Sequence, residues 1–403
     1  PTSPHLDSLA AEALVFSEAV TLVPKTGPSF ASHFTGLQPT THGVTGNMMA
    51  LPAEIPVLAE RLRQAGYATT AFVSNPILSP RKGFDRGFDH YEQFPRDDGL
   101  VELVTAFEAW GEATSWSQPS FVWIHFIDPH GPYTPPPVLR ELFVGDELFD
   151  SDDRLIPVDY DPPVPGRRNR VLGAVPAYQR QGDEGRVAWY VSQYDAEIRH
   201  MDDAFGRLTA LLHRRGLYDA AGILFTADHG ESLGEHDYYF EHGWFVYDAT
   251  LRVPLLVKPP GPGRHQQHDE QVSNLDTLPT LLAMAGLPIP SELPGRSLLG
   301  ALSERPVLAK NPSTYSPRFL ALRTPDHKWI LQLTNGGEEI YDLVADPGET
   351  QNRLSFEPEL AARLRAEAKR QEAAIRAPAR RAPRVVEPGG DEAEFLRALG
   401  YAE

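Results

Sequence analysis

The chain has 403 residues, no cysteine and a formal net charge of -18. It is long enough for one large core plus a smaller domain, and no stretch is apolar over the length of a membrane-spanning helix. The absence of cysteine excludes disulfides and thiolate metal sites, and the negative charge argues against nucleic acid or anionic membranes as partners. A small anionic substrate would therefore need a local positive charge, such as a divalent metal ion.

The first motif is Lys25-Thr26-Gly27-Pro28-Ser29, between an extended segment at 19–23 and a predicted short helix over 29–34. Proline suits the first turn of a helix, because its missing N–H would have no partner there. Unpaired N–H groups and the helix dipole then favour an alkoxide or a bound anion near the Thr26 hydroxyl. Two interpretations stand at this point: Thr26 is a nucleophile, or it only caps the helix.

A helix predicted over 55–64 and a strand over 69–73 precede the apolar segment 121–127, which runs into a polar loop with His130. At the end of a strand, His130 could meet a substrate as an acid or a hydrogen-bond donor. His125 lies inside the apolar segment, so we expect a core histidine whose hydrogen bonds are satisfied.

The clearest helix covers 186–215, where apolar residues recur at steps of three and four. It leads into the apolar run 223–227, which we expect to be a buried parallel strand, and then into Asp228 and His229. A carboxylate and an imidazole at the carboxyl end of a strand suit a divalent cation. The loop that follows adds His236 and His242.

Short strands separated by turns are predicted from about residue 303 onward, which indicates a small antiparallel sheet. The expected strands are 319–323, 328–333 and 339–341. The expected units are a catalytic α/β domain over 1–302, the antiparallel sheet over 303–357, and a helical tail with a Pro/Arg-rich linker over 358–403. We expect this tail to dock through Phe395, Leu396 and Leu399.

Taken together, these segments resemble the sulfatase family of the alkaline phosphatase superfamily over nearly the whole chain. The resemblance rests on the Thr26 motif, Asp128-Pro129-His130, Asp228-His229-Gly230-Glu231, and the segments 62–84, 274–281 and 340–352. It implies an alkaline-phosphatase-like α/β sandwich with a large, mostly parallel central sheet covered by helices.

The resemblance also implies a metal-dependent ester hydrolase with Thr26 as the nucleophile. Its implied metal ligands are Asp228, His229 and Thr26, and His130 and His242 would face the sulfuryl or phosphoryl group. His236 is expected to support or anchor the loop, Arg252 to order it and Glu231 to cap it.

Threonine at position 26 separates this chain from sulfatases of the usual kind, which oxidise a cysteine or serine to formylglycine. Oxidation of threonine gives a ketone, so no formylglycine is expected. A sulfated threonine would have to be hydrolysed directly, whereas water activated at a metal site can hydrolyse a phosphorylated threonine. The residues therefore favour phosphate mono- or diesters over sulfate esters.

Lys25 and Asn47 extend the resemblance to the nucleotide pyrophosphatase/phosphodiesterases, which use a threonine nucleophile. That resemblance implies substrate binding by both residues, with Asn47 as a donor to a phosphoryl oxygen. The alternative for Asn47 is a turn residue after Gly46.

Two departures weaken the expected site. Phe30 stands where relatives carry arginine or histidine, and it cannot donate a hydrogen bond. Relatives also have a strand with metal-binding aspartates before the helix that starts here at Ser3-Pro4. We therefore expect that this first strand is missing and that the metal is under-coordinated, with one ion of Ca, Mn or Zn rather than two.

Two alternatives remain open, a two-metal phosphodiesterase and a non-catalytic member of the family. The first needs a second cluster of one aspartate and two histidines, to which Asp128 and His130 could contribute. The second is favoured by Phe30 and the missing strand. The sequence leaves the oligomeric state open, and the compartment stays open between cytoplasm and periplasm of a bacterial-type cell.

Overall fold

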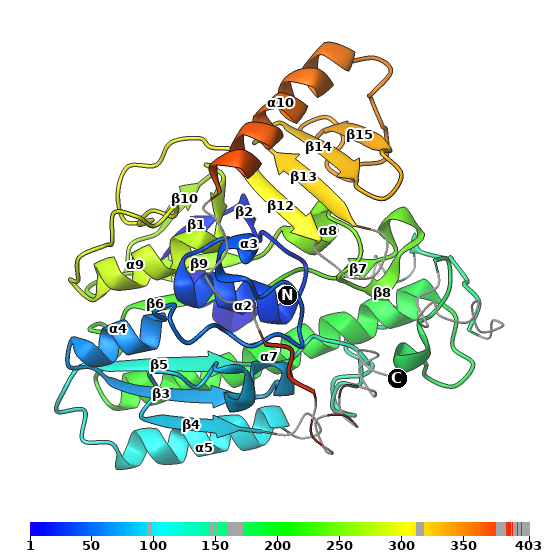
Figure 1. Cartoon of the computed structure of the whole chain (residues 1–403). Coiled ribbons are helices and arrows are strands. Elements are labelled where there is room, and N and C mark those ends of the chain that lie inside the picture. Colours follow the sequence, from blue (N-terminus) through cyan, green and yellow to red (C-terminus); the bar gives the residue numbers. More distant parts are fainter. Residues whose placement is uncertain are drawn as a thin grey trace.

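The computed structural model of the chain describes residues 1–94, 99–145, 149, 151–158, 172–311, 318–375, 384–387, 389, 393 and 396. Helices pack around the strands of the main body, and a small antiparallel sheet with a long helix lies at one end of it (Figure 1). The expected α/β class with a small C-terminal antiparallel sheet is confirmed.

One sheet of the main body is all parallel and consists of β4 (His90–Gln93), β3 (Ala68–Val73) and β5 (Ser120–His125), with β3 in the centre. Five of the six residues of β3 are buried, as expected for a strand with neighbours on both sides. Helix α4 (Leu58–Gln64) precedes β3, and α5 (Gly99–Ala113) lies between β4 and β5 in the sequence. The helix and strand predicted over 55–64 and 69–73 are therefore confirmed within three residues at each end.

The second sheet is mixed, in the order β10 (Gln266–His268), β1 (Leu14–Phe16), β9 (Leu255–Lys258) and β6 (Ile223–Thr226). β1 runs parallel to β10, whereas β9 runs antiparallel to both β1 and β6. The prediction of a buried parallel strand over 223–227 is therefore wrong, since β6 pairs antiparallel and its four residues are half-buried. An apolar run indicates a strand but carries no information on the direction of its partner.

Strands β5 and β6 lie at the edges of these two sheets, each with a strand partner on one side only among the described residues (Figure 1). Most of their residues are half-buried although both strands are strongly apolar. The carboxyl end of β5 lies near the end of β6, since His125 at the end of β5 is close enough to Asp228 after β6 to affect its pKa. Open strand edges of this kind are where a further strand can pair.

The long helix α7 (Val187–Arg214) confirms the helix predicted over 186–215. It packs on α5 and on the short helix α1 (Pro4–Ala10). Its apolar side chains enter three separate clusters, which join α7 to α5, to α1 and to the loop after β5. The helix therefore supports both sheets from one side.

The C-terminal sheet is antiparallel in the order β12 (Val307–Asn311), β13 (Phe319–Arg323), β14 (His327–Gln332) and β15 (Glu338–Asp342). Three of these strands match the predicted segments, and β12 was not predicted. Helix α10 (Pro358–Ala374) packs on one face of the sheet through Ala361, Leu364 and Ala368. Of the predicted tail contacts, Leu396 is buried, whereas Phe395 and Leu399 lie outside the described residues.

Shorter elements connect these units. The remaining helices are α2 (Thr26–Thr35), α3 (Pro39–His42), α8 (Asp248–Leu251), α9 (Thr277–Met284) and the 3-10 turns η1 (Pro76–Leu78), η2 (Pro80–Lys82), η3 (Ala177–Gln179), η4 (Glu235–Asp237) and η5 (Asn274–Asp276). Two pairs of short strands complete the list, β2 (Ala19–Val20) with β11 (Val272–Ser273), and β7 (Ser232–Leu233) with β8 (Tyr239–Glu241).

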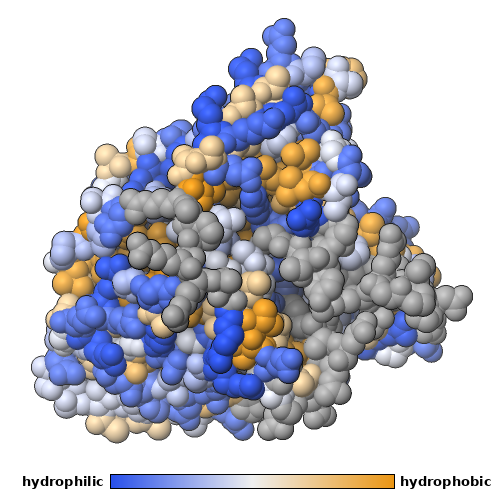
Figure 2. All heavy atoms as spheres, viewed as in Figure 1, coloured by the Kyte–Doolittle hydropathy of each residue, from blue (hydrophilic) through white to orange (hydrophobic). Residues whose placement is uncertain are grey.

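Hydrophilic residues make up most of the coloured part of the face drawn in Figure 2, in keeping with the high net charge. Hydrophobic residues appear on it as separate small patches rather than as one continuous surface. Within the part of the chain that the structure describes, no helix is long and apolar enough to cross a membrane.

Candidate active site

Thr26 is the first residue of α2, and the preceding Lys25 is the N-cap. The interpretation of Thr26 as a helix cap is therefore wrong. Thr26 is only 1% exposed, and its Oγ1 lies 3.4 Å from Nε2 of His229. Its position at the start of the helix places the hydroxyl at the positive end of the helix dipole, as the sequence predicted.

Asp228 and His229 follow the end of β6. Nδ1 of His229 lies 2.9 Å from the carbonyl oxygen of Gly230, and because a carbonyl can only accept, Nδ1 carries the hydrogen. The lone pair is then on Nε2, which lies 3.4 Å from Oγ1 of Thr26 and 3.4 Å from Oδ2 of Asp228. Metal-binding histidines are typically fixed in this way through their other ring nitrogen.

Asn47 contacts the backbone beside the nucleophile. Its Oδ1 accepts a 2.9 Å hydrogen bond from the N–H of Gly27. A Cβ on Gly27 would lie only 3.2 Å from Cα of Asn47, so the close approach favours glycine there. Asn47 thus fixes the first turn of α2 through its oxygen, and its side-chain NH₂ is the group that could donate to an anion. The substrate-binding roles of Asn47 and of the half-buried Lys25 stay predictions.

Three of the predicted histidines form a continuous group of rings. His242 stacks on His229 with the ring centroids 4.0 Å apart, and His130 lies edge-to-face with His242 at 4.9 Å. Nδ1 of His130 is 2.7 Å from the carbonyl of the next residue, and Nδ1 of His242 is 2.9 Å from Oε2 of Glu231. Each of the three imidazoles is therefore anchored through Nδ1, with Nε2 on the opposite side of the ring.

Other residues of this region have structural partners. Arg252 donates a hydrogen bond of 2.9 Å to the carbonyl of Ser17 and pairs with Glu18 at 3.1 Å, which agrees with the expected role in loop order. His236 stacks on Tyr247 with centroids 3.5 Å apart and so anchors the loop. Glu231, which was expected to cap the loop, has its carboxylate 2.9 Å from Nδ1 of His242, further along the same loop.

Phe30 belongs to an aromatic cluster and provides no polar contact. Its ring centroid lies 5.0 Å from that of His125, 5.4 Å from Trp123 and 5.6 Å from His33. His125 is buried as expected, but its Nδ1 has no hydrogen-bond partner among the described residues, so the expectation that its hydrogen bonds are satisfied is wrong. Burial lowers the pKa of His33 and of His125 to about 4 despite the opposing charge of Asp228, so both rings are neutral near pH 7.

Sequence reasoning missed the hydrogen bonds that join α2 to the end of β6. The Ser29 hydroxyl donates to the carbonyl of Asp228 at 2.8 Å. The side-chain amide of Asn274 in turn donates to Ser29 and to Thr21, each at 3.1 Å. Both Ser29 and Asn274 lie in segments that carry the family resemblance, and that placement was the available signal.

Electrostatics keep Asp228 ionised. Burial alone would raise the pKa of this carboxyl, but the electrostatic effect of the His229 and His125 imidazoles and a hydrogen bond from Thr26 outweigh it, and the pKa is lowered. An ionised carboxylate, an imidazole lone pair and a hydroxyl oxygen are donors that a divalent metal accepts. The predicted ligands therefore fit a divalent ion in chemical type, and three donors leave room in its coordination shell for water or substrate.

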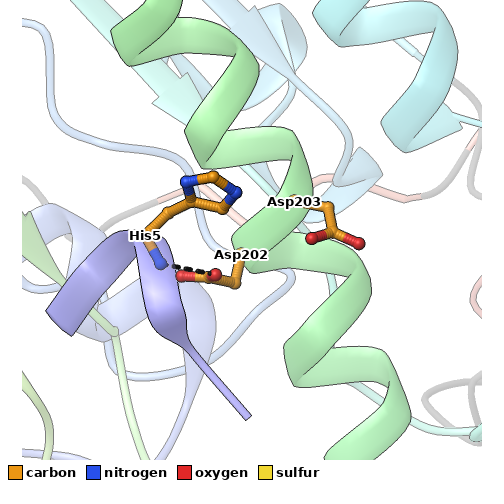
Figure 3. Close-up of side chains that lie close together, drawn as sticks. All are labelled: His5, Asp202 and Asp203. Atoms are coloured by element: carbon orange, nitrogen blue, oxygen red, sulfur yellow. Dashed lines mark hydrogen bonds between the residues drawn. The ribbon is translucent and has the colours of Figure 1, made fainter. Parts of the chain in front are cut away.

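A group of three possible metal-binding side chains, His5, Asp202 and Asp203, lies elsewhere (Figure 3). The carboxylate of Asp202 accepts hydrogen bonds of 2.8 Å from the backbone N–H groups of His5 and Leu6 at the start of α1. Asp203 pairs with Arg199 at 2.9 Å. Both carboxylates have structural partners, and Asp202 caps the start of α1.

Comparison with known proteins identifies the family. The sulfatase family model matches residues 1–287, and the model described as the C-terminal part of N-sulphoglucosamine sulphohydrolase matches residues 234–376. A choline-sulfatase of Rhizobium meliloti is 26% identical over 87% of this chain and 77% of its own length. PehA of Trinickia caryophylli, a multifunctional alkaline phosphatase superfamily protein, is 25% identical over 75% of this chain and 71% of its own.

Among solved structures, a phosphonate monoester hydrolase of Agrobacterium radiobacter superimposes with a TM-score of 0.72 at 20% identity, covering 92% of this chain and 90% of that protein. This likeness concerns the fold. The family match, which spans well over half of the 403 residues, is the decisive one: the chain belongs to the sulfatase family and is an ester hydrolase.

Proposed function

We propose that the protein hydrolyses small phosphate mono- or diesters in a metal-dependent reaction, through a covalent intermediate on Thr26. One observation carries the proposal: the buried Thr26 hydroxyl lies 3.4 Å from Nε2 of His229, which is itself 3.4 Å from the Asp228 carboxylate. A divalent ion held by these three residues would neutralise the anionic ester and favour the alkoxide form of Thr26.

In the first step, Thr26 releases its hydroxyl proton to solvent, and Oγ1 forms a bond to phosphorus while the bond between phosphorus and the leaving oxygen breaks. The leaving oxygen takes a proton from His130 or His242; His242 stacks on His229, and His130 lies edge-to-face against His242. In the second step, water attacks phosphorus and gives a proton to that imidazole. The bond to Oγ1 breaks, phosphate or a phosphate monoester is released, and Oγ1 takes back a proton from solvent, which restores Thr26.

The choice of phosphate over sulfate rests on the nucleophile. With threonine in place of an oxidised cysteine, elimination from a formylglycine hydrate is not open to this chain, and hydrolysis of the covalent intermediate by water is required. The comparisons point in both directions. One sequence relative is named a choline-sulfatase, which favours a sulfate ester as substrate, whereas one protein of the same fold is named a phosphonate monoester hydrolase, which favours phosphoryl chemistry.

The two-metal alternative lacks a supporting observation. In the part of the chain that the structure describes, the three-residue metal-type cluster is His5, Asp202 and Asp203, which caps a helix. The alternative of a non-catalytic protein is disfavoured by the convergence of Thr26 with Asp228 and His229 at one point.

The proposal is tested with aryl sulfate, phosphate monoester, phosphodiester and phosphonate monoester substrates, each with Ca, Mn, Zn or Mg. Thr26→Val keeps the side-chain shape without the nucleophile and should lower kcat by roughly 10³-fold or more. Thr26→Ser keeps a hydroxyl and should retain measurable turnover, with a phosphorylated residue 26 detected by mass spectrometry. Full activity of Thr26→Val would rule out the nucleophile, and turnover of the sulfate alone would rule out the preference for phosphate.

A further inference from the structure

We propose that Glu231 is a positioning residue that fixes the imidazole of His242 for the reaction at Thr26. This inference rests on the proposed function. Oε2 of Glu231 lies 2.9 Å from Nδ1 of His242, and the two residues are 11 positions apart on the loops that follow β6. A carboxylate can only accept a hydrogen bond, so Nδ1 carries the hydrogen and Nε2 is the nitrogen left on the other side of the ring.

Burial strengthens the hydrogen bond between Glu231 and His242. The side chains of Glu231 and His242 are only 6% and 4% exposed. A carboxylate removed from water is costly unless a donor pairs with it, so the loop is held in the conformation that keeps this hydrogen bond. The pair therefore determines the ring orientation of His242 much more strictly than a solvent-exposed contact would.

The orientation matters because of what His242 touches. Its ring is stacked at 28° on His229, whose Nε2 faces Thr26, and it lies at 76° to the ring of His130. His229 and His130 are each anchored by the carbonyl of the next residue along the chain. His242 differs in that its anchor comes from a distant residue, Glu231, which lies two positions beyond His229.

Two tyrosines, Tyr133 and Tyr194, lie close enough to the Glu231 carboxylate to respond to its charge. Burial, followed by the negative charge of Glu231, raises the pKa of Tyr133 well above its usual value, and the same two causes act on Tyr194. The two tyrosine rings lie 5.2 Å apart, edge to face. Glu231 thus has the two tyrosines and the His242 imidazole as neighbours, and these buried surroundings favour one orientation of the imidazole.

The test compares Glu231→Ala with Glu231→Gln, whose amide oxygen can still accept from Nδ1. We expect Glu231→Ala to lower kcat by about 10- to 100-fold with a smaller change in KM, as for other residues that orient a reacting imidazole, and Glu231→Gln to recover most of the loss. Glu231→Met fills the space without an acceptor and replaces the alanine variant if the latter does not fold. Glu235→Gln is the matched control, because Glu235 lies on the same loop and bonds to Ser232 and Leu233 instead.

A second readout reports on the ring itself. In ¹⁵N-histidine NMR, with His242→Gln used to assign the signal, the wild type and Glu231→Gln should show Nδ1 protonated, and Glu231→Ala should show a changed tautomer or an exchanging ring. A wild-type kcat or an unchanged His242 signal in Glu231→Ala would overturn the positioning role. If wild-type turnover does not depend on Thr26, it is the proposed function that fails instead, which the Thr26→Val control identifies separately.

Discussion

The hydroxyl of Ser29 donates a 2.8 Å hydrogen bond to the backbone carbonyl of Asp228, so the helix that begins with Thr26 is tied directly to the strand end that carries the predicted metal ligands. Ser29 is completely buried, and Asn274 donates to the same hydroxyl. A network of hydrogen bonds between uncharged groups thus sets the position of Thr26 relative to Asp228 and His229.

Replacing Ser29 with alanine should therefore reduce both stability and turnover. Loss of the Ser29 hydroxyl leaves the buried Asn274 amide and Asp228 carbonyl with fewer hydrogen-bond partners. This should lower the free energy of unfolding by about 1–3 kcal/mol. A small displacement of Thr26 should lower kcat by about 10- to 100-fold. Urea unfolding and steady-state kinetics measure the two effects. Ser32→Ala is the control, since Ser32 lies on the same helix but bonds to His42, and it should lose stability with little loss of kcat.

His42 gives a pH dependence of stability. Its Nδ1 accepts a hydrogen bond from the N–H of Val44 at 3.1 Å, so the native ring must stay neutral. Burial lowers its pKa to about 3, and the unfolded state therefore binds a proton that the native state does not between about pH 6.5 and 3. The contribution of His42 to the free energy of unfolding is therefore complete above pH 6.5. It falls by about 1.4 kcal/mol for each pH unit below that value.

Urea unfolding at pH 7.5, 6.0 and 5.0 checks this. The stability of the wild type should fall more steeply with decreasing pH than that of His42→Gln, whose side chain does not titrate. His90→Gln, at an exposed histidine, should keep the wild-type slope. Parallel slopes for wild type and His42→Gln would contradict the prediction.

A buried charge network joins the C-terminal sheet to the loop that carries His242. Asp248, at the start of α8, accepts hydrogen bonds from Arg323 at 2.7 Å and Lys328 at 2.5 Å, and both cations are at most 2% exposed. Lys328 also pairs with Glu349 at 2.8 Å. The cations lower the pKa of Asp248 far below its usual value, against the effect of burial, which raises it.

Asp248→Asn should lower the free energy of unfolding by about 3–5 kcal/mol at neutral pH, because two buried cations then have one carboxylate fewer as a partner. Since the native pKa of Asp248 is depressed, its contribution is complete above the unfolded pKa of about 4 and is lost progressively as the pH falls below that value. The two proteins should therefore converge in stability in acid. Glu112→Gln, at an exposed pair with Arg214, should change stability by less than about 1 kcal/mol. An equally small effect of Asp248→Asn would refute the network's role.

A metal-binding assay should distinguish the site at Asp228 from the cluster that contains Asp202. Asp228→Asn should weaken binding of Mn²⁺ by at least about tenfold in calorimetric titration, because it removes the ionised ligand beside His229. Asp202→Asn should leave binding unchanged and lower thermal stability, because Asp202 accepts the N–H groups of His5 and Leu6. The reverse pattern would assign the metal to the cluster in Figure 3.

Patterns that are local in the chain predicted much of the structure. The steps of three and four in α7, the apolar run of β3 and the turn-separated strands β13, β14 and β15 were read correctly, since each depends on side chains within one element. The family resemblance also implied that Thr26, Asp228 and His229 meet, and the strand-end position of Asp228 and His229 agreed with it. By contrast, β6 was assigned the wrong partner direction and β12 was not predicted.

The sequence by itself therefore determined the family, the α/β class and the types of reactive side chain. The tertiary structure decided what holds each of them: the carboxylate on His242, the serine that lies 199 positions from the carbonyl it binds, and the buried His125 nitrogen that has no partner within the described residues. The physical reason is that hydrogen-bond partners are chosen by distance and burial in the folded chain, and a motif carries the identity of a side chain but not its neighbours across the fold.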